Sequence, residues 1–357
     1  MDRTILATIL DAGVRAPSGE NCQPWRFVAD LEKDTLCLYN VPERDRSLYN
    51  FNQFGSLVSH GAVIENIIIA ASSFHYDSAV ELFPDARHPD LVARIQFKDD
   101  KTIPADSLFE YIAKRASNRL AYKTTTLPEA NEIRTSAIPE SLRNDGRVDF
   151  IIDETKKKRL AQAFSYADEL LFENDMVHDF LFQHIYWTLR DAEKERSGFY
   201  IKELGLAGPQ EIVFKLLQKK RFLAFSKKIG FPKIAAKGNV GLYSNVSALG
   251  AVIMKGDAPD DFVNGGRIME RAWLLATKLG YDIQPLTAII FFMQRIQGNA
   301  AQDFSPTQIA GIEASYKTVQ DVFQLAQFET PVMLFRIGKG KPISHKSLRR
   351  PPDITYR

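Results

Sequence analysis

The chain has 357 residues, of which 45% are apolar and 25% are charged, a balance typical of a folded globular protein rather than a disordered one. Its formal net charge of +2 gives no electrostatic reason to expect nucleic acid or an anionic membrane surface as a partner. Two cysteines are too few for a disulfide framework or a four-thiolate metal site, and the length suits two domains of ordinary size.

The N-terminal residues lack the basic and then apolar pattern of a secretory signal. The longest apolar stretch, 62–71, is interrupted by Glu65 and Asn66 and is too short to span a bilayer. We therefore expect a cytoplasmic protein without a membrane partner.

A tight corner is predicted at residues 16–25, which read Ala-Pro-Ser-Gly-Glu-Asn-Cys-Gln-Pro-Trp. They follow an amphipathic helix whose apolar residues recur at helical spacing. Pro17 cannot continue that helix, and Gly19 permits backbone angles that other residues resist. Ser18 and Asn21 then present short polar groups, either as ordinary turn residues or as ligand contacts.

The chain divides into two predicted halves at the polar stretch 98–105, so that the first half is 1–105 and the second is 106–357. The first half contains strands at 25–29 and 35–39, a buried helix at 61–77, and hairpin strands at 78–83 and 91–97. The second half contains a helix at 108–115, a strand at 148–152, a helical region at 155–230, a buried helix at 262–279 and a strand at 330–337.

The two buried helices resemble each other. Segments 61–77 and 266–282 align at a constant offset of 205 residues, with Gly, Glu, Ala, Tyr and Asp at matching positions. Both segments are apolar almost all round, as expected for helices buried between layers. Shared composition by chance and an ancient duplication, with one unit in each half, are the two interpretations.

An anion site is predicted at Arg115-Ala-Ser-Asn-Arg119, which places two guanidinium groups and the Ser117 hydroxyl within five residues. Arginine suits phosphate because its planar fork can bond two oxygens at once. A solvated loop with two surface arginines is the alternative.

The turn at 16–25 and the pattern at 115–119 resemble two motifs of the nitroreductase family, Ala-Pro-Ser-x-x-Asn-x-Gln-Pro-Trp and Arg-x-Ser-x-Arg. Gly19 stands where a second serine is frequent. The resemblance covers most of the chain and is weakest in a helical insertion at about 155–237. It implies an α+β fold in which two layered domains, each a mostly antiparallel sheet flanked by helices, are fused as an intramolecular pseudo-dimer.

The resemblance also implies one site for flavin mononucleotide (FMN) between the halves. The implied contacts are Pro17, Ser18, Gly19 and Asn21 at the flavin ring, Arg115, Ser117 and Arg119 at the phosphate and ribityl chain, and Arg349 or Arg350 from the closing segment at the phosphate. After the second buried helix, Gln284, Pro285, Leu286 and Thr287 match the family segment that places a backbone N–H near flavin N5. Leu286 and Thr287 are the candidates for that N–H, and a plain helix-to-strand connection is the alternative.

Two functions remain open. In the first, electrons pass from NADH or NADPH through FMN to a nitroaromatic, quinone or similar small-molecule acceptor, with no catalytic side chain and no metal. In the second, the insertion covers FMN, as it can in the fused subgroup, and the protein stores or sequesters flavin. The chain is expected to be a monomer that imitates the family dimer, and further homodimerisation stays open.

One run, from Ile212 to Gly256, carries lysines and arginines but no acidic residue, and its first part, inside the insertion, predicts a basic amphipathic helix. A solvated face is the plain interpretation. A lid over the flavin, attraction of an anionic nicotinamide cofactor and a partner surface are the alternatives.

Overall fold

Two five-stranded sheets form the framework of the computed structural model, which describes residues 1–206 and 208–357. Ala207, inside the predicted insertion, lies outside the described residues. Across the first sheet the order is β12 (Ile354–Tyr356), β1 (Trp25–Asp30), β2 (Thr35–Asn40), β4 (Leu91–Asp99) and β3 (Tyr76–Leu82). Across the second it is β10 (Asp282–Pro285), β11 (Glu329–Gly340), β9 (Ala248–Lys255) and β6 (Gly146–Ile151), with β5 (Tyr122–Lys123) also paired to β11.

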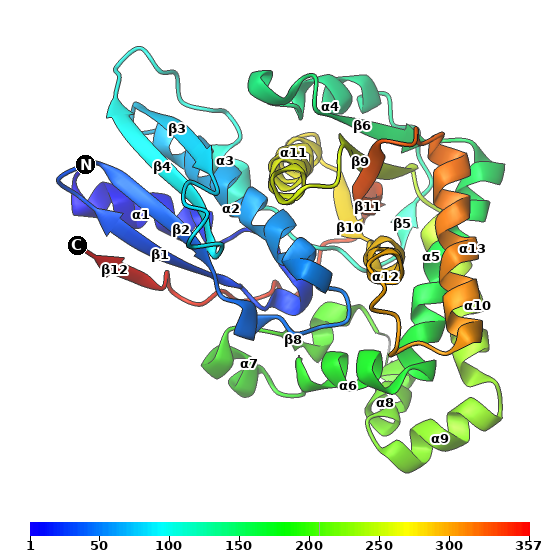
Figure 1. Ribbon diagram of the computed structural model, residues 1–357. Coiled ribbons are helices and arrows are strands. Elements are labelled where there is room, and N and C mark those ends of the chain that lie inside the picture. The colour runs from blue at the N-terminus through cyan, green and yellow to red at the C-terminus, as the bar shows by residue number, and fades with distance from the viewer. Residues whose placement is uncertain (207) are drawn as a thin grey trace.

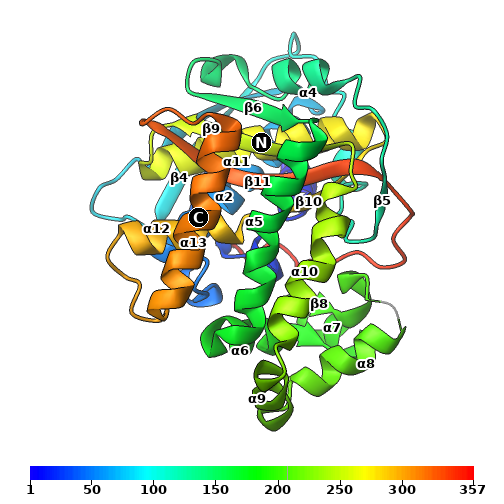
Figure 2. The ribbon, with the colours of Figure 1, turned by 90° about the vertical axis from the view of Figure 1, so that its right-hand side faces the viewer.

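Helices flank both sheets. Of the helices between β6 and β9, α5 and α10 stand beside the second sheet, and α6 to α9 lie at the bottom of the molecule in both views (Figures 1 and 2). The helices are α1 (Arg3–Gly13), α2 (Phe54–Ser72), α3 (Phe109–Ile112), α4 (Ala130–Ser136), α5 (Glu154–Glu173), α6 (Asp175–Gln183), α7 (Leu189–Glu195), α8 (Gly208–Leu217), α9 (Lys220–Lys228), α10 (Phe231–Ser244), α11 (Pro259–Lys278), α12 (Ala288–Gln297) and α13 (Pro306–Phe323). A small parallel pair, β7 (Ile185–Tyr186) and β8 (Phe199–Tyr200), lies within the insertion.

The two sheets share one topology. Four strands run β1-β2-β4-β3 across the first sheet and β6-β9-β11-β10 across the second, with all neighbours antiparallel. In each set the long buried helix, α2 or α11, connects the second strand to the third in chain order. The predicted α+β class with two mostly antiparallel sheets is therefore confirmed, and the arrangement is consistent with two fused domains.

The shared topology also locates the insertion. In the first sheet β1 and β2 are joined by a short turn, whereas α5 to α10 lie between the equivalent strands β6 and β9. The boundaries at 105 and at 155–237 remain predictions, because the strand order fixes only which connection was lengthened.

Helices α2 and α11 cross in close contact at the centre of the molecule (Figure 1). A Cβ at Gly61 would lie 1.9 Å from the carbonyl oxygen of Val263, and a Cβ at Gly266 would lie 2.0 Å from that of Val58. Gly61 and Gly266 match in the sequence repeat, and Val58 and Val263 are separated by the same offset. The contact is therefore reciprocal, as expected where two related units meet about a two-fold axis.

Several predicted helices end differently in the structure. The helix expected at 108–115 is only the single turn α3, because the chain bends after Ile112 to bring Arg115 to the interior. The helical region expected at 155–230 is broken after Glu173, where the Asn174 side chain accepts hydrogen bonds from two backbone N–H groups and starts α6. An asparagine at this position caps a new helix rather than continuing the old one.

The segment 51–72, which contains α2, is long and apolar enough to cross a membrane, although its longest apolar stretch alone, 62–71, is too short. In the fold, 83% of its most apolar window is buried, as in the core helix of a globular domain. The expected cytoplasmic location stays a prediction.

Candidate functional site

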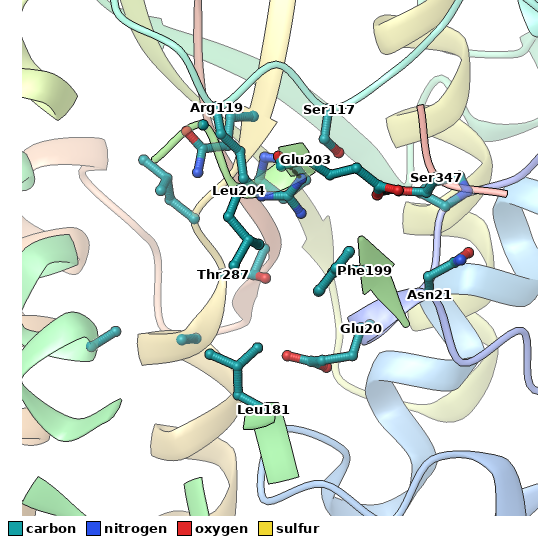
Figure 3. Close-up of a pocket in the computed structure, with 18 of the residues that line it drawn as sticks. Glu20, Asn21, Ser117, Arg119, Leu181, Phe199, Glu203, Leu204, Thr287 and Ser347 are labelled. Atoms are coloured by element: carbon teal, nitrogen blue, oxygen red, sulfur yellow. Dashed lines mark hydrogen bonds between the residues drawn. The ribbon is translucent and has the colours of Figure 1, made fainter. Parts of the chain in front are cut away.

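A cavity of about 940 Å³ lies between the two halves and the insertion (Figure 3). All of the predicted site residues except Arg350 line it, namely Pro17, Ser18, Gly19, Asn21, Arg115, Ser117, Arg119, Gln284, Pro285, Leu286, Thr287 and Arg349. Residues separated by more than 300 positions in sequence thus meet around one space. Ligand cavities commonly measure about 300–1,000 Å³, so this one is at the upper end.

The predicted corner is a 3₁₀ turn at Gly19–Asn21, with left-handed backbone at Glu20 (φ 40°) and Asn21 (φ 55°). The Ser18 hydroxyl accepts a hydrogen bond from the backbone N–H of Gln23 at 3.0 Å, which fixes the turn. The Asn21 amide donates to the carbonyl oxygens of Gly198 (3.1 Å) and Leu348 (2.9 Å). Asn21 therefore ties the insertion and the C-terminal segment to the turn.

Arg115 is buried and already has a charged partner. Its Nε lies 3.0 Å from Oε1 of Glu270 on α11, and its guanidinium lies 4.6 Å from the centre of the Trp273 ring. Burial raises the pKa of Glu270, although the positive charge of Arg115 opposes that shift. Arg115 can therefore attract and orient a bound anion, but the Glu270 carboxylate already balances part of its positive charge.

A cluster of positive side chains lies beside Arg115. Burial first, and then the like charge of Arg115, lower the pKa of Arg349 to about 9. Burial, Arg115 and Arg15 also lower the pKa of Lys346. Cations held close enough to repel one another are stabilised when an anion enters between them, so this end of the cavity fits a phosphate group.

Arg350 lies outside the cavity. Its backbone N–H donates to Oε1 of Gln23 at 2.8 Å, and its guanidinium donates to the carbonyl oxygen of Glu195. Of the two arginines expected from the closing segment, only Arg349 lines the cavity.

The segment expected near flavin N5 is β10 and the start of α12. The N–H of Leu286 already donates to the carbonyl oxygen of Leu334 at 2.7 Å. Thr287 is the N-cap residue of α12, so the positive end of that helix dipole faces the cavity. Thr287 is thus the better placed of the two candidates.

Residues 196–205, which we call the strap, cross the cavity between the turn and Arg119. Gln23 donates to the carbonyl oxygen of Arg196 at 2.7 Å, and the Arg119 guanidinium lies 4.6 Å from the Phe199 ring centre. Arg119 also donates to the carbonyl oxygen of Glu203 at 3.3 Å. The strap comes from the insertion, and contacts residues of both halves.

Three carboxyl groups on the cavity wall were not predicted as site residues. Burial, with the nearby Asp45 carboxyl, raises the pKa of Glu20 to about 8, and burial raises the pKa of Asp45 as well. Burial also raises the pKa of Asp168 to about 6. None of the three takes part in an ion pair among residues 1–206 and 208–357. Glu20 lies inside the turn motif itself, which was the available signal, whereas nothing in the local sequence marks Asp168.

Comparison with known proteins identifies mycobacterial relatives. An uncharacterized protein of Mycobacterium tuberculosis is 24% identical over 348 residues, covering 96% of this chain and 47% of that protein. A second protein of that organism, named Putative NAD(P)H nitroreductase acg, is 29% identical over 195 residues, covering 52% of this chain and 54% of that protein. The chain thus spans about half the length of these relatives. It matches no protein-family model.

The solved structures that the comparison matches are more distant. A nitroreductase with bound FMN from Bacteroides fragilis has 13% identity and a TM-score of 0.38, covering 68% of this chain and 95% of that one. The FMN-dependent nitroreductase NfnB from Mycobacterium smegmatis, in complex with NADPH, has 12% identity and a TM-score of 0.36, covering 65% and 86%. TM-scores this low assign neither the fold nor the ligand. The sequence relatives support the nitroreductase family that the motifs indicated.

Proposed function

We propose that this nitroreductase-like chain binds FMN in the cavity between its halves and acts as an NAD(P)H-dependent oxidoreductase on a small-molecule acceptor. The observation that supports it is the meeting of the turn at 16–25, the 115–119 segment and the start of α12 around one cavity with a cationic end. Bound FMN would supply the redox chemistry, and the protein would supply binding, orientation and electrostatics.

Different residues of the cavity would bind the phosphate, the ribityl chain and the ring of FMN. Arg349 and Lys346, whose pKa values are lowered by burial and by the positive charges of Arg115 and Arg15, would hold the phosphate. The Ser117 hydroxyl lines the same cavity and would bond the phosphate or the ribityl chain. Thr287, at the positive end of α12, would favour negative charge on the reduced ring.

The cofactor assignment can be tested with FMN and riboflavin, which differ only in the phosphate. We expect Arg349→Gln to raise the dissociation constant for FMN about tenfold, as for loss of a charge-assisted hydrogen bond, and to leave that for riboflavin unchanged. Arg350→Gln, which changes the neighbouring arginine outside the cavity, is the matched control. Equal weakening of both ligands, or no binding of either by the unmodified protein, would contradict the assignment.

The strap favours a second candidate, a protein that retains flavin without turnover. Its bonds to Asn21, Gln23 and Arg119 engage polar groups of the turn and of the 115–119 segment, and a segment held in this way would slow exchange of a bound flavin. Anaerobic addition of NADPH to the flavin-loaded protein separates the two functions. Bleaching of the flavin absorbance on mixing supports the oxidoreductase, and persistent colour supports retention.

A further inference from the structure

Helices of the insertion line one part of the same cavity, which we call the insertion compartment. Large apolar side chains from α5, α6, α8 and α10 line it, namely Leu171, Phe172, Leu181, Phe214, Leu217 and Phe231. These residues belong to a hydrophobic cluster separate from the main core. The compartment therefore has walls of its own, which the two sheets do not provide.

Asp168, on α5, is the carboxyl group of this compartment. Its Oδ2 accepts hydrogen bonds from the Asn239 amide and the Tyr243 hydroxyl of α10, each at 2.9 Å. Within the part of the chain that the structure describes, Oδ1 has no hydrogen-bond partner and the carboxyl group has no cationic partner. One oxygen is thus fixed by the protein and the other is available to a ligand.

Two cations lie near Tyr243, since the charges of Arg119 and Arg336 oppose the rise in its pKa. Neither forms an ion pair with Asp168 among the described residues, so the carboxyl group keeps no direct counter-charge. Burial raises the pKa of Tyr49, and the negative charges of Glu20 and Asp168 raise it further, so both carboxyl groups act on the Tyr49 hydroxyl. Figure 3 shows Glu20 pointing into the cavity on the side of Leu181. The positive side chains Arg349 and Lys346 are held beside Arg115.

Asp168 is half-buried, and a carboxylate that has lost part of its hydration is costly without a counter-charge. A ligand can remove this cost by supplying a positive charge attached to an apolar body. We propose that the insertion compartment binds an apolar molecule that carries a protonated amine. The amine bonds the Asp168 carboxylate, and the apolar part packs against the six apolar side chains named above. Binding requires no flavin, so this inference stands apart from the proposed function.

Three naphthalene fluorophores that share one apolar body test the charge preference: dansylcadaverine, which carries an amine, neutral dansylamide and anionic dansylglycine. We expect dansylcadaverine to bind at least about tenfold more tightly than dansylglycine, as for a charged hydrogen bond. Asp168→Asn, which keeps the shape of the side chain, should remove that preference and leave dansylamide binding unchanged. Glu169→Gln, the next residue of α5 and outside the cavity lining, should change nothing.

Ala235→Trp, which fills the compartment from α10, should abolish binding of all three probes in a protein with unchanged circular dichroism and thermal unfolding. Equal affinity for the three fluorophores, equal loss of all three in Asp168→Asn, or no binding of any probe to the unmodified protein would overturn the proposal. The flavin content of the same samples is measured separately, so failure here is distinguishable from failure of the cofactor assignment.

Discussion

Glu203 brings a negative charge from the strap to the cationic end of the cavity. Its carboxylate accepts a hydrogen bond from the Ser347 hydroxyl, and its charge raises the pKa of Arg349 against the effect of burial. Figure 3 shows the side chain reaching past Ser117 toward Ser347. The Glu203 carboxylate stabilises the positive charge of Arg349 as a phosphate would. A bound phosphate would therefore lie close to this carboxylate and be repelled by it.

Removing that charge should strengthen FMN binding. We expect Glu203→Gln to lower the dissociation constant for FMN about fivefold, because roughly 1 kcal/mol of like-charge repulsion is lost, and to leave riboflavin binding unchanged. Fluorescence titration of the flavin measures both constants. Glu195→Gln removes one charge just before the strap, outside the cavity lining, and serves as the control. Weaker FMN binding in Glu203→Gln would instead make Glu203 a direct ligand of the cofactor.

Glu20 should make stability depend on pH in the neutral range. Its pKa is about 8 in the folded protein, because of burial and the Asp45 carboxyl, against an ordinary value of 4.5. The folded state therefore binds this proton more tightly than the unfolded state does. The contribution of the proton to the free energy of unfolding is fully present below about pH 4.5 and is lost as the pH rises through 8.

The substitution Glu20→Gln removes this dependence. Thermal unfolding at pH 4, 7 and 9 should give equal midpoints for the variant and the unmodified protein at pH 4, and a higher midpoint for the variant at pH 9. Glu32→Gln, in an exposed turn, should follow the unmodified protein at each pH. A difference that is constant across the pH range would show that Glu20 acts through packing rather than through its charge.

At the scale of elements, the crossing of α2 and α11 holds the two halves together. Gly61→Ala would place a methyl group 1.9 Å from the Val263 carbonyl oxygen, so the helices would have to move apart. We expect the free energy of unfolding to fall by about 3 kcal/mol, as for overpacking at a close backbone contact. Urea denaturation followed by circular dichroism measures it.

Gly238→Ala is the control for helix propensity. Gly238 lies within α10, and a Cβ there would have no heavy atom within 4 Å. The same substitution should raise the free energy of unfolding by about 0.5–1 kcal/mol, because alanine loses less backbone entropy. A similar loss of stability in both variants would mean that the crossing is not the cause.

Four strands of the first sheet, two of the second and both buried helices were predictable because their signals are local, whereas β9, β10 and β12 were not predicted. The hairpin of β3 and β4 follows from two apolar runs separated by turn residues, and the relation of α2 to α11 follows from a repeat that is visible in the sequence. The strap was not predictable. Asn21 meets Gly198 across 177 residues and Leu348 across 327, and no local pattern at these positions indicates such contacts.

The ion pair of Arg115 is another contact that no local sequence pattern reveals. The sequence indicated an arginine suited to phosphate, but its ion pair with Glu270 arises only when α11 packs beside the 115–119 segment. Glu270 matches Glu65 in the repeat, and Glu65 is also buried. A glutamate at the same position of two apolar helices was the available signal in the sequence, because a carboxylate buried in such a helix needs a positive partner.

At the scale of the whole molecule, the two halves are related in topology but differ in charge around these glutamates. Glu270 pairs with Arg115 at the edge of the cavity, whereas Glu65 pairs with Arg267 (3.1 Å) and Arg271 (2.8 Å), and Arg271 also bonds Asp106 (2.6 Å). Both arginines beside Glu65 are thus in ion pairs with carboxylates within the protein. We infer that only one of the two pseudo-symmetric positions keeps positive charge available for a phosphate.

The asymmetry predicts one FMN for each chain. Flavin released by denaturation is measured by absorbance and compared with protein concentration, while light scattering after size exclusion gives the mass of the particle that carries it. One flavin per chain is expected whether the particle is a monomer or a dimer, because each chain supplies both the turn and the cationic end. Two flavins per chain would mean that the Glu65 side also accepts a phosphate. One flavin per two chains would mean that the site is completed by residues from a second copy, and the cavity within one chain would then be insufficient.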